Sequence, residues 1–126
     1  MDASVLRIEM PIKLPSLNEY VNACRSNPYV GAKMKKDSEE LIGWFIKKIA
    51  PFRNPVEVSF TWVEPNRRRD VDNIAFGKKF ILDALVKNGV LQDDSQKYVR
   101  ALSDSFKIGN DYMIILEIKE LKETKQ

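Results

Sequence analysis

Residues 56–89 read VEVSFTWVEPNRRRDVDNIAFGKKFILDALVKNG, and this stretch decides the fold. Residues 56–63 alternate along an extended chain and are rich in β-branched and aromatic side chains, which predicts a strand. The apolar residues that follow predict a helix over residues 72–87 or 77–87. Gly89 ends this helix, because glycine readily adopts the left-handed conformation that follows a helix C-terminus. The stretch therefore predicts a strand, a loop and a helix in succession.

Two more elements are predicted before this stretch. Residues 5–12 alternate roughly between apolar and polar side chains and predict a first strand. Prolines, asparagines and a glycine in residues 15–31 predict an irregular segment. Residues 32–49 repeat apolar side chains at helical spacing and predict a helix, which Pro51 ends.

Two strands are predicted after it, over residues 99–106 and 112–121, and residues 108–111 are predicted to join them as a hairpin. The element order is then β-α-β-α-β-β. This order predicts the α+β class, with a mixed sheet and two helices packed on it. The length of 126 residues fits a single domain over residues 1–126.

The composition excludes several kinds of chemistry. The chain has no histidine, which excludes histidine acid–base catalysis and histidine metal sites. Cys24 is the only cysteine, so neither an intrachain disulfide nor a cysteine-cluster zinc site can form. The five glycines are too widely spaced for a Rossmann fingerprint or a P-loop. Carboxylates, lysines, hydroxyls and an oxygen-bound metal remain as candidates for catalysis.

Membrane insertion and secretion are not expected. The apolar runs are far shorter than the roughly 18 residues that a membrane helix needs. The first residues lack the cationic lead and apolar stretch of a secretion signal. We therefore expect a cytoplasmic protein that has no membrane partner.

Basic residues form two local clusters in a chain whose net charge is only +3. Such clusters favour contact with a phosphate backbone more than net charge does. The clusters therefore predict DNA-binding residues, and a solvated helix start or loop is the alternative. The candidates are Lys33, Lys35, Lys36, Arg67, Arg68 and Arg69.

Acidic residues suggest a metal site. Asp70 and Asp72 follow the strand of residues 56–63, and residues i and i+2 of an extended chain point to the same side. A divalent cation would relieve their mutual repulsion, and ligation by carboxylates alone suits Mg²⁺ or Mn²⁺. Asp93 and Asp94 follow the second helix and could supply a third carboxylate, depending on the path of the loop. The alternative is a helix-capping acid and a turn.

A lysine shares the second predicted helix with these acids. If the helix begins near Asp72, then Asp72, Lys79 and Asp83 lie on one flank of it, and Lys78 lies near the buried stripe. Lys79 is then the better catalytic candidate. A simple surface pair between Lys79 and Asp83 is the alternative.

In combination, these residues resemble the RusA family of Holliday-junction resolvases. The resemblance covers roughly residues 5–118 and is sharpest in residues 67–94. Residues 15–20 also look like the family's loop after the first strand. The matching residues are Arg69-Asp70-Val71-Asp72-Asn73, Lys79, Asp83-Ala84-Leu85, Gly89-Val90 and Asp93-Asp94.

The resemblance implies Asp70, Asp72 and Asp94 as metal-binding catalytic carboxylates, Lys79 as the catalytic lysine, and Arg69 beside the DNA phosphates. It also implies homodimers that act on four-way DNA junctions with Mg²⁺ or Mn²⁺, often encoded by phages and prophages.

Two assignments stay open in this resemblance. Residues 73–78 form a longer spacer than in the shorter family members, so Lys78 is an alternative to Lys79. Asp93 is an alternative to Asp94, although the register favours Asp94.

The function predicted from the sequence is Mg²⁺-dependent hydrolysis of phosphodiesters in branched DNA, in recombination and repair. Three alternatives remain. One is a catalytically inactive module that binds branched DNA. Another is a metal-dependent phosphoesterase that acts on small phosphate esters. The third is a structural or interaction protein whose acids are only helix caps.

Overall fold

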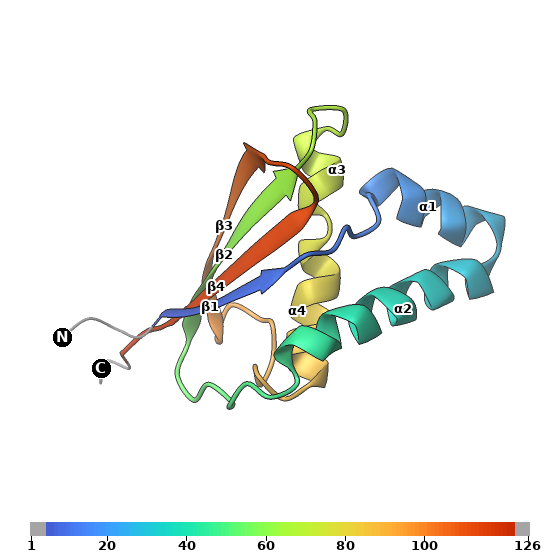
Figure 1. The fold of residues 1–126 in the computed structure, drawn as a ribbon. Helices are drawn as coiled ribbons and strands as arrows, with labels where there is room; N and C mark the ends of the chain where they lie inside the picture. Colours follow the sequence, from blue (N-terminus) through green and yellow to red (C-terminus); the bar gives the residue numbers. More distant parts are fainter. Residues whose placement is uncertain (1–4, 123–126) are drawn as a thin grey trace.

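The computed structural model describes residues 5–122, which form a four-stranded sheet and four helices (Figure 1). In chain order the elements are β1 (Val5–Met10), α1 (Leu17–Ser26), α2 (Pro28–Ile46), β2 (Val56–Glu64), α3 (Val71–Ala75), α4 (Lys78–Lys87), β3 (Val99–Ile108) and β4 (Met113–Glu120).

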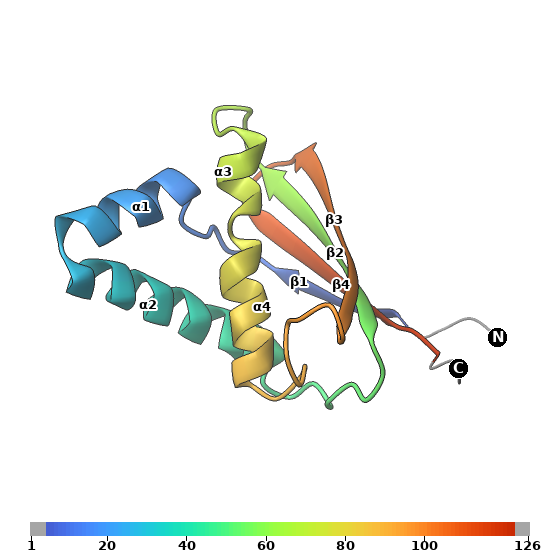
Figure 2. The same cartoon turned by 180° about the vertical axis from the view of Figure 1, so that it is seen from behind.

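The sheet is mixed, in the order β1-β4-β2-β3. Strand β2 pairs parallel with β3 and antiparallel with β4, and β4 pairs antiparallel with β1. Figures 1 and 2 show the helices on one side of this sheet, with α3 and α4 running along it. The predicted α+β class and mixed sheet are thus confirmed.

The core lies between the sheet and the helices. Alternate residues of β2 are buried, as the sequence pattern predicts, and Phe60 is almost fully enclosed. The helical layer contributes buried side chains to the same core cluster, among them Phe80 and Leu85 of α4 and Ile42 of α2. No helix in residues 5–122 is long and apolar enough to span a membrane.

The number of helices differs from the prediction. The segment expected to be irregular contains α1, because Ser16 and Glu19 form a capping box in which each side chain binds the other residue's backbone N–H. Helix α2 begins at Pro28, where Asn27 caps it and proline suits the first turn. The turn-forming residues of this segment therefore act as helix caps.

The second predicted helix is divided into α3 and α4 by a tight turn at residues 76–77. Both predicted starting points, near Asp72 and at Gly77, correspond to the start of one of these helices. Gly89 follows α4 with a φ of 75°, which confirms the predicted left-handed glycine.

The predicted hairpin between the last two strands is wrong. Strands β3 and β4 lie on opposite sides of β2, where Ile108 is opposite Glu64 and Met113 is opposite Val63. The residues between them therefore cross the end of β2. Alternation in a sequence shows which face of a strand is buried, but it does not show which strands are neighbours. Because β4 carries the fuller row of buried residues, it occupies the interior position and leaves β3 at the edge.

Candidate functional site

Asp70 and Asp72 lie at the start of α3. Asp70 is the N-cap residue in an extended conformation, and Asp72 is in the first helical turn, so both side chains are exposed at one helix end. The prediction that they share one extended segment directly after a strand is wrong, because β2 ends at Glu64 and a loop over residues 65–69 intervenes. The two acids are nevertheless both exposed at the start of α3, and Mg²⁺ is commonly held by one or two carboxylates together with water and substrate phosphates. Their oxygen donors therefore fit such an ion.

Helix α1 holds the start of α3 in place. The backbone N–H of Asn18 donates to the side-chain oxygen of Asn73 at 2.9 Å. Asn73 follows Asp72 directly, and its own N–H donates to the Asp72 carboxylate at 2.9 Å. The segment of residues 15–20 that resembles the family's N-terminal loop is thus the start of α1, adjacent to the two acids.

The third predicted acid lies elsewhere in the chain. Asp94 is exposed in the loop between α4 and β3, and this loop leads into Val99 opposite Val56, the first residue of β2. Asp70 follows the opposite end of β2. Within residues 5–122, no group of three or more acids or cysteines lies close enough together to hold a metal ion. One chain therefore places Asp70 and Asp72 at the start of α3, but it does not bring Asp94 to them.

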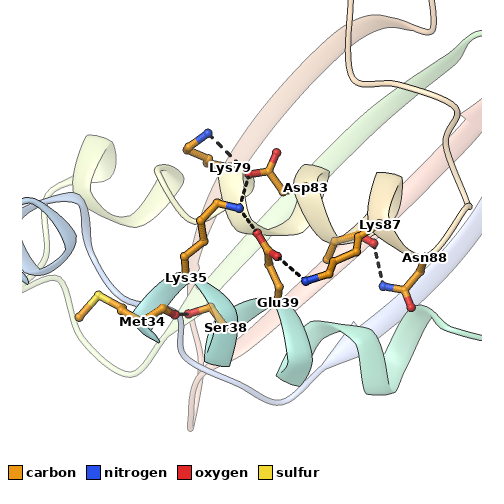
Figure 3. Close-up of polar contacts among 9 residues, drawn as sticks. Met34, Lys35, Ser38, Glu39, Lys79, Asp83, Lys87 and Asn88 are labelled. Atoms are coloured by element: carbon orange, nitrogen blue, oxygen red, sulfur yellow. Dashed lines mark hydrogen bonds and ion pairs between the residues drawn. The ribbon is translucent and has the colours of Figure 1, made fainter. Parts of the chain in front are cut away.

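Lys79 faces α2 in an ionic network (Figure 3). Its ammonium lies 3.6 Å from the Asp83 carboxylate, and the Lys35 ammonium lies 3.4 Å from the same carboxylate. Lys35 also pairs with the buried Glu39, whose other oxygen is 3.5 Å from the Lys87 ammonium. The hydrogen bond to Glu39 raises the pKa of Lys35 above its ordinary value. The predicted grouping of Lys79 with Asp83 is confirmed, and no contact links Lys79 to Asp72 in the described chain.

Lys78 points in a different direction, toward the sheet. It pairs with Asp104 of β3, which also accepts a hydrogen bond from the Trp62 indole N–H at 2.8 Å. The predicted position of Lys78 near the buried side of the helix is therefore confirmed. Lys78 is engaged inside the fold, whereas the side chain of Lys79 is half exposed.

The six predicted DNA-binding residues differ in their availability. Arg67, Arg68 and Lys36 are exposed and form no ion pair within residues 5–122. Lys33 is exposed and pairs with Asp37 at 2.6 Å, which raises its pKa. The remaining two, Lys35 and Arg69, form ion pairs with the buried acids Glu39 and Glu64.

A cavity of about 480 Å³ opens beside Asp70. Its lining combines acidic, basic and apolar side chains from β2, the following loop, α3 and the end of β3. Val71, Phe106 and Ile108 contribute apolar side chains that are 40–58% exposed. The complete lining consists of Trp62, Glu64, Asn66, Arg67, Arg69, Asp70, Val71, Ile74, Phe106, Lys107 and Ile108.

Two acids of structural importance near the site were not identified from the sequence. Glu64 is the last residue of β2 and is buried against Arg69. Glu39 is buried between Lys35 and Lys87. The only sequence signal for Glu39 is Lys35, four residues earlier on the same helix. Such pairs of opposite charge are common on exposed helix surfaces, so the spacing does not show that Glu39 is buried. The pairing of Glu64 with Arg69 depends on the loop conformation, so spacing does not reveal it.

Comparison with protein families identifies the family of this chain. The family model described as endodeoxyribonuclease RusA matches residues 11–119, which is nearly the whole chain. A search of the curated proteins finds no match. The match spans β2, both acid-bearing segments and the basic loop, and it shows that the chain belongs to the RusA endodeoxyribonuclease family.

Proposed function

We propose that this protein is a Mg²⁺-dependent endodeoxyribonuclease that cuts four-way junctions or other branched DNA in recombination and repair. The membership in the RusA family supports this proposal. The observation that carries it is the exposed pair Asp70 and Asp72, which follows the exposed Arg67 and Arg68 after one intervening residue, Arg69. Acids that suit a hard cation thus adjoin side chains that suit a phosphate backbone.

The proposed roles follow from the position of each side chain. Asp70 and Asp72 hold Mg²⁺, for which Mn²⁺ can substitute. When bound, the ion supplies positive charge against the phosphate oxygens and lowers the pKa of water. The ammonium of Lys79 offsets charge that develops on a phosphate oxygen, and Asp83 holds this lysine on the α2 side of α4. Arg67, Arg68 and Lys36 contact the DNA backbone.

The third acid, Asp94, comes from a second copy of the chain in this proposal. Strand β3 supports it, since β3 is an edge strand in which only Val99 is buried and only Asp104 is partly buried. The other edge differs, because α2 packs near β1 and Met10 is fully buried there. A long, uncovered edge strand is a template for pairing with another chain.

The direction of such pairing decides which residues meet. Identical strands related by a closed two-fold axis that share one hydrogen-bonded ladder run antiparallel. The start of the partner's β3 then lies beside the end of this chain's β3, where Phe106, Lys107 and Ile108 border the cavity next to Asp70. Since Asp94 precedes the start of β3 by a few residues, the partner copy brings that acid toward the basic rim of Arg67 and Lys107.

Cleavage of a synthetic four-way junction tests the proposed function. We expect the protein to nick the junction with Mg²⁺ or Mn²⁺ and to leave a linear duplex of the same sequence uncut. Asp70→Asn should abolish cutting and retain junction binding, or tighten it, because it removes one negative charge near the phosphates. Glu40→Gln removes an exposed acid of α2 and should cut at the wild-type rate. Wild-type cleavage by Asp70→Asn would contradict the assignment.

A catalytically inactive junction-binding module is the second candidate, and the distance between Asp94 and the acid pair within one chain favours it. It predicts junction binding without cleavage in any divalent cation. A phosphoesterase for small esters predicts instead the hydrolysis of a chromogenic phosphodiester and no preference for branched DNA.

A further inference from the structure

The turn between α1 and α2 forms the outer end of a helical hairpin. Figures 1 and 2 show both helices extending away from the sheet, with this turn at the end remote from the strands. Helix α1 ends at Ser26 and α2 begins at Pro28, so a single residue, Asn27, joins them. Residues 24–30 are all exposed and are called the hairpin tip below.

The hairpin tip has a fixed backbone. The N–H of Asn27 donates to the carbonyl of Ala23 at 3.3 Å and ends α1, and its side-chain oxygen accepts the N–H of Tyr29 at 2.8 Å and starts α2. The two helices also cross in close contact, because a Cβ at Gly31 would lie 2.5 Å from the Sγ of Cys24. The cap and this crossing therefore hold the tip in one conformation.

An aromatic side chain stands on this tip. Tyr29 is 82% exposed, which is the highest value among the large apolar side chains of residues 5–122. Single exposed apolar side chains are common on protein surfaces, so exposure alone assigns no role to Tyr29. A ring on a fixed backbone loses little conformational entropy when it binds, because tyrosine has only two rotatable side-chain bonds. Tyr29 is thus built to bind a flat partner at low cost.

The charges around Tyr29 indicate an anionic partner. Residues 20–36 contain four basic side chains and no acidic one. Of the basic ones, Arg25 and Lys36 are exposed and form no ion pair within residues 5–122. The other two, Lys33 and Lys35, pair with acids one turn farther along α2. A basic surface without acids suits a phosphate backbone, and an exposed aromatic ring within it suits a base.

The hairpin tip is close enough to the acid pair to contact the same DNA. Helix α1 begins beside α3, where the Asn18 N–H donates to Asn73 at 2.9 Å. The 10 residues of α1 span roughly 15 Å, which corresponds to about four base-pair steps of DNA. The centre of one DNA junction can therefore contact both the acid pair and the tip.

Branched DNA offers such a ring more than linear DNA does. In a continuous duplex both faces of each internal base are covered by its neighbours, and inserting a side chain between them costs a few kcal/mol of stacking per step. At a branch point the stack is already interrupted, so a base face is available without that cost. A rigid aromatic tip therefore favours the branch point over the linear arms.

We infer that Tyr29 stacks on a base at the branch point and thereby makes the protein prefer branched to linear DNA, while Arg25 and Lys36 contact the adjacent phosphates. This inference rests on the proposed function and deepens it, because it names a residue that selects the substrate. The acids and Lys79 perform the hydrolysis, and Tyr29 takes no part in it.

Binding of a four-way junction and of a linear duplex of the same sequence tests the inference. Affinities of the wild type, Tyr29→Ala and Tyr29→Phe are measured without divalent cations, so that the DNA stays uncut. Trp44→Ala is the matched control, since Trp44 is 70% exposed near the other end of α2. A second junction carries abasic sites at the branch point. Melting temperatures and sedimentation confirm that each variant is folded and has the oligomeric state of the wild type.

We expect Tyr29→Ala to lose about 5- to 150-fold in junction affinity, as is usual when an aromatic ring that stacks on a base is removed. Its affinity for the linear duplex should equal that of the wild type. Tyr29→Phe keeps the ring and Trp44→Ala changes a distant one, so both should bind the junction like the wild type. On the abasic junction, the difference between the wild type and Tyr29→Ala should disappear, because the ring and the base act as one coupled pair.

Three results would overturn the inference. Wild-type junction affinity of Tyr29→Ala would show that the ring makes no contact. An equal loss on junction and duplex, or a loss that persists on the abasic junction, would show a general DNA contact. A changed oligomeric state of Tyr29→Ala would show that Tyr29 binds a second copy of the chain instead. A wild type that neither prefers junctions nor cuts them refutes the proposed function; a wild type that does both, with Tyr29→Ala unaffected, refutes this inference alone.

Discussion

Glu19 illustrates how one side chain stabilises the region beside the acid pair. Its carboxylate accepts the backbone N–H of Ser16 at 2.9 Å, and the Ser16 hydroxyl accepts the N–H of Glu19 at 3.1 Å. The hydrogen bond from the Ser16 backbone lowers the pKa of Glu19 below its ordinary value of 4.5. The charged form of Glu19 therefore stabilises the start of α1, and α1 in turn binds Asn73 through Asn18.

This lowered pKa predicts an acid-dependent loss of stability. Because the folded pKa lies below the unfolded one, the contribution is complete above pH 4.5 and disappears as the pH falls through the folded pKa. Glu19→Gln can still complete the capping box but carries no charge. Between about pH 5 and pH 3, the melting temperature of the wild type should fall more than that of Glu19→Gln. Parallel curves for the two proteins would contradict the prediction.

At the level of single residues, the sequence predicted types of chemistry better than contacts. It placed Lys79 on the flank with Asp83 and Lys78 toward the buried side, and the structure confirms both. It did not predict that Arg69 is partly buried and paired with Glu64, because three successive arginines look alike until the loop conformation is known. The roles of Asp70, Asp72, Asp94 and Lys79 in catalysis stay predictions.

At the level of elements, Glu39 and its partners join α2 to α4. Glu39 is 6% exposed, and its carboxylate lies between Lys35 of its own helix and Lys87 of α4 (Figure 3). Lys35 also reaches Asp83, which holds Lys79. The contact between the two helices therefore fixes the position of the proposed catalytic lysine.

Neighbouring lysines of α2 should differ in their importance for folding. Lys35→Gln leaves the Glu39 carboxylate buried with one exposed partner, and we expect it to reduce the free energy of unfolding by about 1–3 kcal/mol. Lys36→Gln changes an exposed residue and should stay within about 0.5 kcal/mol of the wild type. Urea unfolding measures both values. Equal stabilities of the two variants would show that the network does not support the fold.

The elements themselves were partly predictable. The alternating and β-branched pattern of β2 predicted a strand that the structure confirms almost to the residue. The segment that forms α1 was predicted to be irregular, because caps and turns use the same residues. The partners of β3 and β4 depend on the packing of the whole sheet, so local turn signals could not predict them.

At the level of the whole molecule, two features support the pairing of two chains. One is the uncovered edge strand β3, and the other is the separation of Asp94 from Asp70 and Asp72 within one chain. The structure of one chain places Asp70 and Asp72 beyond one end of β2 and Asp94 near the other end. When two β3 strands pair antiparallel, the start of one strand lies beside the end of the other. Asp94 of one copy then lies toward the acid pair Asp70 and Asp72 of the other copy. The proposed nuclease site therefore needs two chains, and a dimer contains two such sites.

Mixing two inactive variants tests this central claim most directly. Asp70→Asn and Asp94→Asn should each abolish junction cleavage. After subunit exchange, each mixed dimer holds one site with both acids intact, so the mixture should regain roughly a quarter of the wild-type sites. Cleavage and Mn²⁺ binding should recover together. If exchange is complete and the mixture stays inactive, with no recovery of Mn²⁺ binding, the two-chain site is contradicted.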